Sequence, residues 1–194
     1  MRAVDMKRVI SLSLAVSMFF SVATANAAKC KYNVDTVNHR TGEKVRWTKW
    51  NTFRLRQDPV MLAVVAEGDR KYLALRMNGS RGTRTERPTV EVLDSELIVQ
   101  EGANLLVLMA DESVLELHAE KEVIADSYYY VMKNGTYDMH FNVIIKYELD
   151  AGALIELTSK RLKVLRLSAG DEDFDFEFGD KGSDRVSKAL VCIN

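Results

Sequence analysis

The sequence predicts a mainly β protein: an antiparallel β-sandwich or a partly open barrel with one or two short helices, one of them C-terminal. Three observations lead to this class. Short apolar runs separated by turn residues fill most of the chain. Several segments alternate polar and apolar residues, as half-buried strands do. Helical spacing of apolar residues is confined to two stretches near the C-terminus.

The N-terminal segment has the three parts of a secretory signal peptide. Arg2, Lys7 and Arg8 give it a basic start, residues 9–22 carry no charge, and Ala25-Asn26-Ala27 fits a cleavage site. An uncleaved membrane anchor is the alternative, but the apolar run is shorter than the ~20 residues that span a bilayer.

Cleavage of the predicted signal peptide would set the start of the mature chain. We expect residues 1–27 to be removed, with translation starting at Met1 or at Met6, and residues 28–194 to form one β-rich domain. The expected location is periplasmic or secreted. No later stretch is long and apolar enough to span a membrane after signal cleavage.

The two cysteines lie near the two ends of the mature chain. Because an oxidising compartment favours pairing, we expect Cys30 and Cys192 to form a disulfide that ties these ends together. Free or intermolecular thiols and a redox pair are the alternatives. The sequence has no Cys-x-x-Cys motif to support a thioredoxin-like role.

The first expected hairpin joins the apolar runs 60–66 and 71–77 through the turn residues Glu67-Gly68-Asp69. Residues 78–88 are polar, basic and contain chain breakers, which predicts a loop.

The second hairpin joins the apolar run 105–109 to residues 114–120 through the polar residues 111–113. Alternation divides its second strand into an apolar face with Leu115, Leu117 and Ala119 and a polar face with Glu116, His118 and Glu120.

The third hairpin is marked by Asn134-Gly135 between the strand-like runs 128–133 and 136–149. This dipeptide favours a type I′ turn, in which both residues have positive φ. In the second run Tyr137, Met139, Phe141 and Val143 share one face, and Asp138, His140 and Asn142 share the other.

The C-terminal part combines strands and helices. Asp150 can cap a short helix over residues 150–160. Residues 162–167 and 173–178 read as strands, and in the latter every second residue is a phenylalanine. Residues 180–192 predict a terminal helix, with Ser183 or Asp184 near its start, that carries Cys192 towards Cys30.

Charge is unevenly distributed along the mature chain. Residues 28–89 hold 14 basic and 6 acidic residues, whereas residues 90–194 hold 10 basic and 21 acidic residues. Cross-strand pairing of opposite charges is one explanation, and a bipolar surface with one basic face is the other. The acidic C-terminal part and the predicted export argue against a nucleic-acid partner.

Two histidines suggest a metal site. Glu116, His118 and Glu120 would neighbour Asp138 and His140 if their strands paired, and such a set would suit zinc or copper. Exposed strand histidines are the alternative. The sequence indicates no other metal site and no organic cofactor.

Four arginines lie in or just before the predicted loop 78–88 and suggest an anion-binding site, because guanidinium groups suit phosphates and carboxylates. They are Arg76, Arg81, Arg84 and Arg87. A basic aromatic stretch around Trp47 and Trp50 could also bind sugars, although core packing explains it equally. An anionic glycan or an envelope protein is therefore the expected partner.

The two ends of the mature chain resemble a group of small exported bacterial proteins. At the start these residues are Tyr32-Asn-Val-Asp35 and Thr41-Gly42-x-Lys44, with Val37–Arg40 as an insertion between them. At the end they are Lys163-Val-Leu-Arg166, the alternating strand and the final helix. The resemblance implies an exported β-rich domain and supplies no catalytic residues.

The sequence contains no motif that assembles a nucleophile, a base and an oxyanion donor. The stretch Asn78–Gly82 differs from the Gly-x-Ser-x-Gly nucleophile elbow. We therefore expect a non-enzymatic binding or accessory module. A metal- or ligand-dependent enzyme or metal carrier that uses His118 and His140, and a structural partner that adds a β-strand to another protein, are the alternatives.

Overall fold

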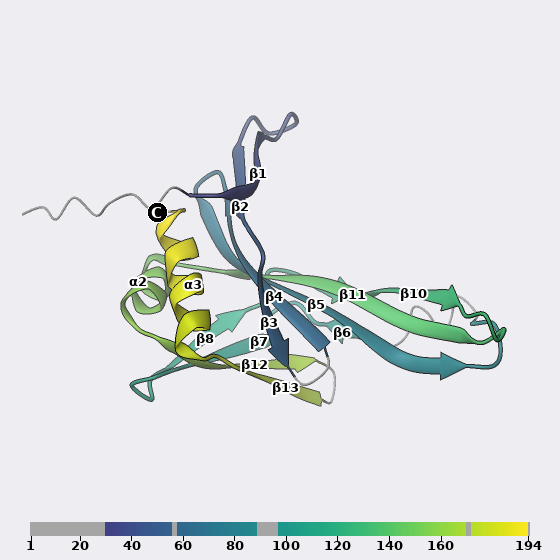
Figure 1. The fold of residues 1–194 in the computed structure, drawn as a ribbon. Coiled ribbons are helices and arrows are strands. Elements are labelled where there is room, and N and C mark those ends of the chain that lie inside the picture. The colour runs from purple at the N-terminus through teal and green to yellow at the C-terminus, as the bar shows by residue number, and fades with distance from the viewer. Residues whose placement is uncertain (1–29, 56–57, 89–96, 170–171, 194) are drawn as a thin grey trace, which may run out of the picture.

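The computed structural model describes residues 30–55, 58–88, 97–169 and 172–193. Within these residues the chain forms antiparallel sheets and two helices, one of them C-terminal, which confirms the mainly β architecture (Figure 1). The predicted signal peptide lies outside the described residues.

The bounds of the elements follow chain order. The strands are β1 (Tyr32–Val37), β2 (Lys44–Thr48), β3 (Asn51–Leu55), β4 (Asp58–Glu67), β5 (Arg70–Arg84), β6 (Ile98–Val99), β7 (Asn104–Met109), β8 (Val114–His118), β9 (Val123–Ile124), β10 (Asp126–Val131), β11 (Tyr137–Glu148), β12 (Leu162–Ala169) and β13 (Glu172–Glu177). The helices are α2 (Ala151–Ser159) and α3 (Asp180–Val191).

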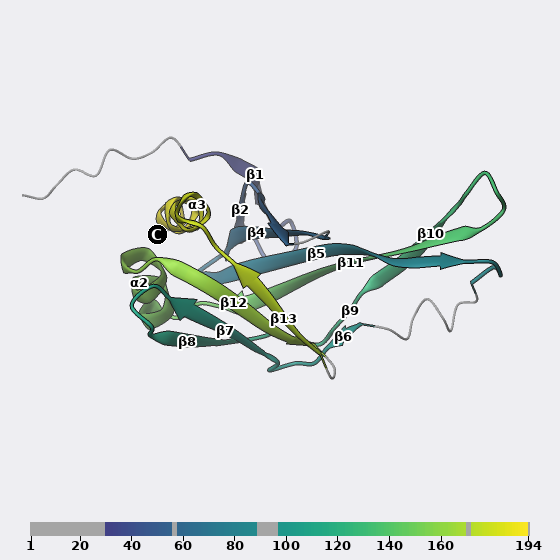
Figure 2. The ribbon, with the colours of Figure 1, turned by 60° about the horizontal axis from the view of Figure 1, so that its bottom comes forward.

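Two sheets make up most of the described structure. The larger has the order β1-β2-β4-β5-β11-β10, with β3 also paired to β4, and the smaller has the order β13-β12-β7-β8. Strands β4, β5 and β11 lie over the smaller sheet in the tilted view (Figure 2). The predicted hairpins therefore form as β4–β5, β7–β8 and β10–β11.

The main core lies between these sheets. It contains fully buried side chains from both layers, including Leu75 and Ile145 from the larger sheet and Val107 and Leu165 from the smaller one. Phe176 is buried in the same core, while its neighbours Asp175 and Glu177 are exposed. The alternation read from the sequence thus assigns the correct face of β13.

Both predicted helices are present. The Asp150 side chain accepts a 2.7 Å hydrogen bond from the Ala153 amide and caps α2 as expected. Helix α3 begins at Asp180, as the predicted range 180–192 has it, with Gly179 as its N-cap. Ser183 instead lies buried inside the helix, where its hydroxyl accepts a hydrogen bond from the Leu162 amide at the start of β12.

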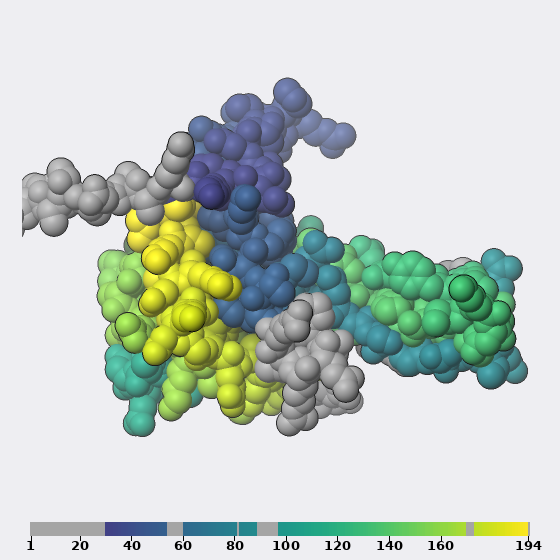
Figure 3. All heavy atoms as spheres, viewed as in Figure 1, coloured from purple at the N-terminus to yellow at the C-terminus, as the bar shows by residue number. Residues whose placement is uncertain are grey.

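The disulfide Cys30–Cys192 is confirmed, with a Cα–Cα distance of 5.6 Å. Next to it, the Tyr32 hydroxyl donates a 2.7 Å hydrogen bond to the Cys192 carbonyl. The space-filling view shows α3, in yellow, directly beside the first strands, in purple and blue (Figure 3). The disulfide thus holds the C-terminal end of α3 next to the start of the described chain.

The predicted loop over residues 78–88 is wrong for most of its length, because β5 continues as a strand to Arg84. It pairs with β11 throughout, with a shift in register between Met139 and His140. Gly82, with φ of +89°, lies at this irregularity. The outer parts of β5, β11 and β10 form a projecting arm, residues 78–84 and 126–142 (Figures 1 and 3).

Gly79 allows the arm to form. A Cβ atom at this position would lie 2.4 Å from Cε1 of Phe141, so the phenylalanine ring rests on the bare backbone. We expect Gly79→Ala to lower the free energy of unfolding by about 1–3 kcal/mol, the usual cost of overpacking. Urea denaturation measures this change.

The control for this prediction is the double variant Gly79→Ala/Phe141→Leu, which removes the ring that the new methyl group would meet. It should be less destabilised than the sum of the two single variants. Additive effects of the two substitutions would contradict the proposed contact.

The turn of the β10–β11 hairpin differs from the type I′ turn expected at Asn134-Gly135. Gly135 has a φ of +80°, whereas Asn134 has a negative φ. The Asn134 side chain accepts hydrogen bonds from the amide and the hydroxyl of Thr136. This capping stabilises a longer connection, closed by the Met132 amide donating to the Thr136 carbonyl.

Candidate functional site

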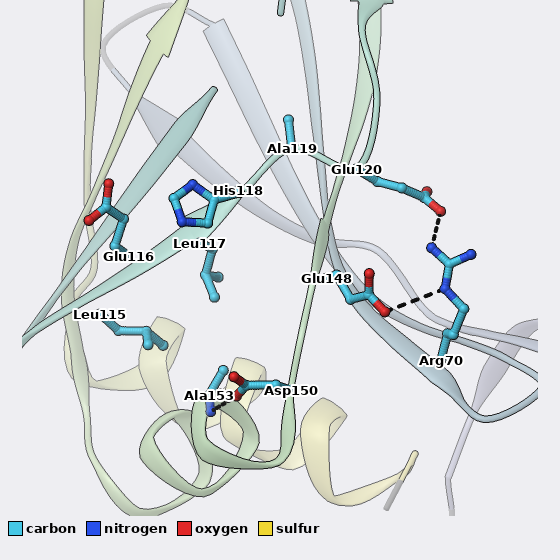
Figure 4. A pocket seen from close by; sticks show the side chains of 10 residues that line it. All are labelled: Arg70, Leu115, Glu116, Leu117, His118, Ala119, Glu120, Glu148, Asp150 and Ala153. Atoms are coloured by element: carbon cyan, nitrogen blue, oxygen red, sulfur yellow. Dashed lines mark hydrogen bonds and ion pairs between the residues drawn. The ribbon is translucent and has the colours of Figure 1, made fainter. Parts of the chain in front are cut away.

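A pocket of about 440 Å³ lies where the end of β8 meets the end of β11 and the start of α2. The two sheets join here through an isolated bridge between Ala119 and Tyr147. The Glu120 amide donates to the Lys146 carbonyl at 2.9 Å and continues this contact. Figure 4 shows the side chains around the pocket.

The pocket has an apolar floor and a charged rim. Leu117, Ala119 and Ala153 are almost fully buried and form part of its lining. The charged residues of the lining are Arg70, Glu116, Glu120, Glu148 and Asp150, joined by His118. Within the described residues β8 pairs with β7 alone, so the pocket borders an edge strand and meets side chains from both of its faces.

An ion-pair network closes one side of the rim. Arg70 bonds to Glu120 through Nη2 at 2.6 Å and to Glu148 through Nε at 3.4 Å (Figure 4). The Tyr72 hydroxyl donates to the same Glu120 oxygen at 2.9 Å. Burial, together with this hydrogen bond, raises the pKa of Tyr72 well above its ordinary value, so the phenol keeps its proton.

The remaining polar side chains of the rim, those of Asp150, His118 and Glu116, differ in whether they have a hydrogen-bond partner. Asp150 is engaged as the cap of α2. Nδ1 of the His118 ring lies within hydrogen-bond distance, 2.9 Å, of the Asn104 side-chain oxygen. No hydrogen bond or ion pair within the described residues involves Glu116, whose side chain is exposed. Glu116 is therefore the rim carboxylate without a protein partner.

The residues of the predicted metal site fall into two groups. Glu116, His118 and Glu120 surround the pocket, whereas Asp138 and His140 lie on the arm. The structure joins β8 to β11 at Tyr147, seven residues from His140, or roughly 23 Å along a strand. The described residues contain no group of three or more His, Cys, Asp and Glu side chains placed to hold a metal ion.

On the arm, His140 belongs to a cluster of rings. It stacks on Tyr128 with a centroid distance of 5.6 Å and meets the edge of Tyr130 at 5.2 Å. Asp138 bonds to Nε2 of His140 at 2.9 Å and accepts from the Ser80 hydroxyl at 3.3 Å. Because the carboxylate stands between serine and histidine, the histidine cannot take the serine proton as it would in a catalytic triad.

The four arginines of the predicted anion site do not converge. Arg76 and Arg84 lie on one strand, eight residues or roughly 27 Å apart, and Arg81 lies between them in β5. Arg76 donates to the Asn142 side chain at 2.9 Å, and Arg87 donates to the Tyr129 hydroxyl at 3.2 Å.

The aromatic stretch forms a small second core. Trp47 and Trp50 contact each other at 5.8 Å and pack against a buried cluster that includes Val65 and Tyr72. Lys146 lies over the Trp47 ring and pairs with Glu67 at 2.6 Å. Packing therefore accounts for these tryptophans.

Sequence analysis singled out three residues of the lining, Glu116, His118 and Glu120, but grouped them with Asp138 and His140 in a metal site. It missed Arg70, Glu148 and Asp150 as their neighbours. Arg70 is the first residue of β5, Glu148 is the last residue of β11 and Asp150 is the N-cap of α2, so the three residues share no motif or spacing.

Comparisons with known proteins supply no function for this chain, so functional conclusions depend on the geometry of the pocket. No protein-family model, curated protein or solved structure matches this chain. In the part of the chain that the structure describes, no helix has both the length and the apolar character needed to cross a bilayer.

Proposed function

We propose that this chain is an exported, non-enzymatic binding module whose ligand enters the pocket between β8, β11 and α2. One observation carries the proposal: a cavity of about 440 Å³ with an apolar floor and a few charged groups at its rim. Small-molecule sites typically have this character, with volumes of roughly 300–1,000 Å³.

The rim indicates the charge of the ligand. The lining contains four carboxylates and one guanidinium, that of Arg70. Three of these carboxylates hold protein partners, and Glu116 is the one that can meet a ligand. A ligand with an apolar body and an amine or guanidinium group would place its body on Leu117 and Ala119 and reach across the edge of β8, so that its cation lies near Glu116 on the other face of the strand.

Most of the carboxylates in the lining are held by other protein groups. The described lining residues contribute carboxylates, an imidazole, a guanidinium and aliphatic groups. The carboxylates Glu120 and Asp150 stabilise neighbouring protein groups. The site therefore provides shape and charge for recognition.

The N-terminal segment and the disulfide support export as the setting. The first 27 residues have the composition of a signal peptide. The Cys30–Cys192 bridge is of a kind that persists in oxidising compartments. The ligand would then be met outside the cytoplasm.

Isothermal titration calorimetry tests the proposal with tryptamine and with arginine-containing tripeptides as cationic probes. Indole-3-propionate and glutamate-containing tripeptides serve as matched anionic probes. We expect the cationic probes to bind and the anionic ones not to bind. Glu116→Gln should weaken cation binding about 10- to 100-fold, because a hydrogen bond to a charged group contributes about 1.5–3 kcal/mol.

Glu177→Gln is the matched control, because Glu177 is an exposed carboxylate on β13, away from the pocket. It should bind the cationic probes as the unchanged protein does. Equal binding of cations and anions, or equal behaviour of the two glutamine variants, would refute the assignment of the pocket.

A further inference from the structure

The tip of the arm exposes apolar side chains. Among the described residues, ten large hydrophobic side chains are exposed, and five of them fall within residues 124–132. Tyr130, Val131 and Met132 lie at the tip, with exposed fractions of 58%, 67% and 46%. A concentration of exposed apolar surface on a projecting element is typical of an interaction site.

The tip is also basic. Residues 80–87 and 131–137, which meet at its end, contain four basic residues and one acidic residue, Glu86. The basic residues are Arg81, Arg84, Arg87 and Lys133. The next carboxylate along the arm, Asp138, is engaged by Ser80 and His140.

A groove of about 260 Å³ lies on the outer face of the smaller sheet. Cross-strand register places Leu108, Val114 and Val164 beside one another on this face, where Val114 is 60% exposed. Leu106, Arg166 and Asp175 complete the lining. This second apolar surface faces away from the core.

The groove is surrounded by negative charge. The same register places four carboxylates and Arg166 on this face. The carboxylates are Glu116, Asp173, Asp175 and Glu177. Arg166 forms a two-point bond with Asp175 at 2.6 and 2.7 Å, which lowers the pKa of this carboxyl and keeps it ionised.

We propose that the arm tip of one copy of this chain docks into the sheet groove of a second copy. The two surfaces match in both respects: an apolar, basic projection meets an apolar, acidic groove. The arm extends away from the smaller sheet, so the tip does not reach the groove of its own chain (Figures 1 and 2).

The geometry of this contact is head to tail, because the two surfaces are different. In a dimer of this kind, the tip of one copy and the groove of the other copy remain unoccupied. Further copies can therefore add until a ring closes or a short filament forms. The contact consists of one tip in one small groove and is not a broad interface of the standard size, which buries roughly 1,600 Å². The association is therefore weak, concentration-dependent and sensitive to salt.

Sedimentation velocity at rising concentrations of the purified protein tests this proposal. The average mass should rise above that of the monomer, and the rise should shrink at high salt. Met132→Asp at the tip and Val114→Asp in the groove should each abolish it. Ile155→Asp is the matched control, because Ile155 is a similarly exposed side chain on α2, and it should associate normally.

A mixture of the two variants that do not self-associate, Met132→Asp and Val114→Asp, gives the most specific test. Met132→Asp retains its groove and Val114→Asp retains its tip, so the mixture should form one-to-one complexes and nothing larger. A monomer at every concentration, a mixture that stays monomeric, or an Ile155→Asp variant that also fails to associate would overturn the proposal.

Discussion

Removing the disulfide is expected to lower the free energy of unfolding by about 5 kcal/mol, a value at the upper end of the range for the loss of one disulfide. The Cys30–Cys192 bridge closes a loop with a sequence separation of 162 residues, and a long loop gains much conformational entropy when it opens. The double variant Cys30→Ser/Cys192→Ser avoids a free thiol. Urea denaturation of this variant beside the oxidised protein measures the loss.

Treating the unchanged protein with a reducing agent is the control, because it should move the urea midpoint to that of the double variant. The variant itself should not respond to the reducing agent. If oxidised and reduced proteins unfolded at the same urea concentration, α3 and the first strands would be held together by other contacts, such as the hydrogen bond from Tyr32 to Cys192.

Leu165→Ala is expected to destabilise the protein by about 2–5 kcal/mol through the cavity that it leaves. Leu165 is fully buried at the centre of β12, opposite Val107 of β7 and Phe176 of β13. Because it faces the core between the two sheets, its loss weakens the contact between them. The shift in the urea midpoint, at unchanged slope, gives the size of the effect.

Ile155→Ala provides the comparison, since this side chain is 66% exposed on α2. Its effect should stay within about 0.5 kcal/mol, as for other surface substitutions. A small effect of Leu165→Ala, equal to that of Ile155→Ala, would mean that the smaller sheet packs independently of the larger one.

Local patterns predicted the elements whose burial is one-sided. In β13 the phenylalanines alternate with carboxylates, and the structure buries Phe176 between exposed Asp175 and Glu177. In α2 the Asp150 side chain forms the cap that its position predicts. These features depend on neighbouring residues alone, so the sequence is sufficient to find them.

The outer part of β5 was predicted as a loop because it lacks that pattern. Asn78, Gly79 and Ser80 are polar or small, and such residues normally mark loops. They form a strand because β11 supplies a continuous partner and because the Phe141 ring covers Gly79. Both causes are contacts between residues about 60 positions apart, since Gly79 pairs with Phe141.

The pocket was only partly predictable for a related reason. The alternation of β8 identified Glu116, His118 and Glu120 as one polar face, but their neighbours depend on how β8 meets β11. The bridge from Ala119 to Tyr147 sets this relation and brings Glu148 to the pocket instead of His140. Register between distant strands is determined by the packed core and not by local spacing.

An NMR titration of the ¹⁵N-labelled protein with tryptamine, at a protein concentration below that of self-association, tests the proposed function most directly. We expect the amide signals of residues 115–120 and 148–153 to shift together and saturate, while those of the arm stay in place. Shifts confined to the arm, or an unchanged spectrum at saturating tryptamine, would contradict a cation-binding pocket at the junction of the two sheets.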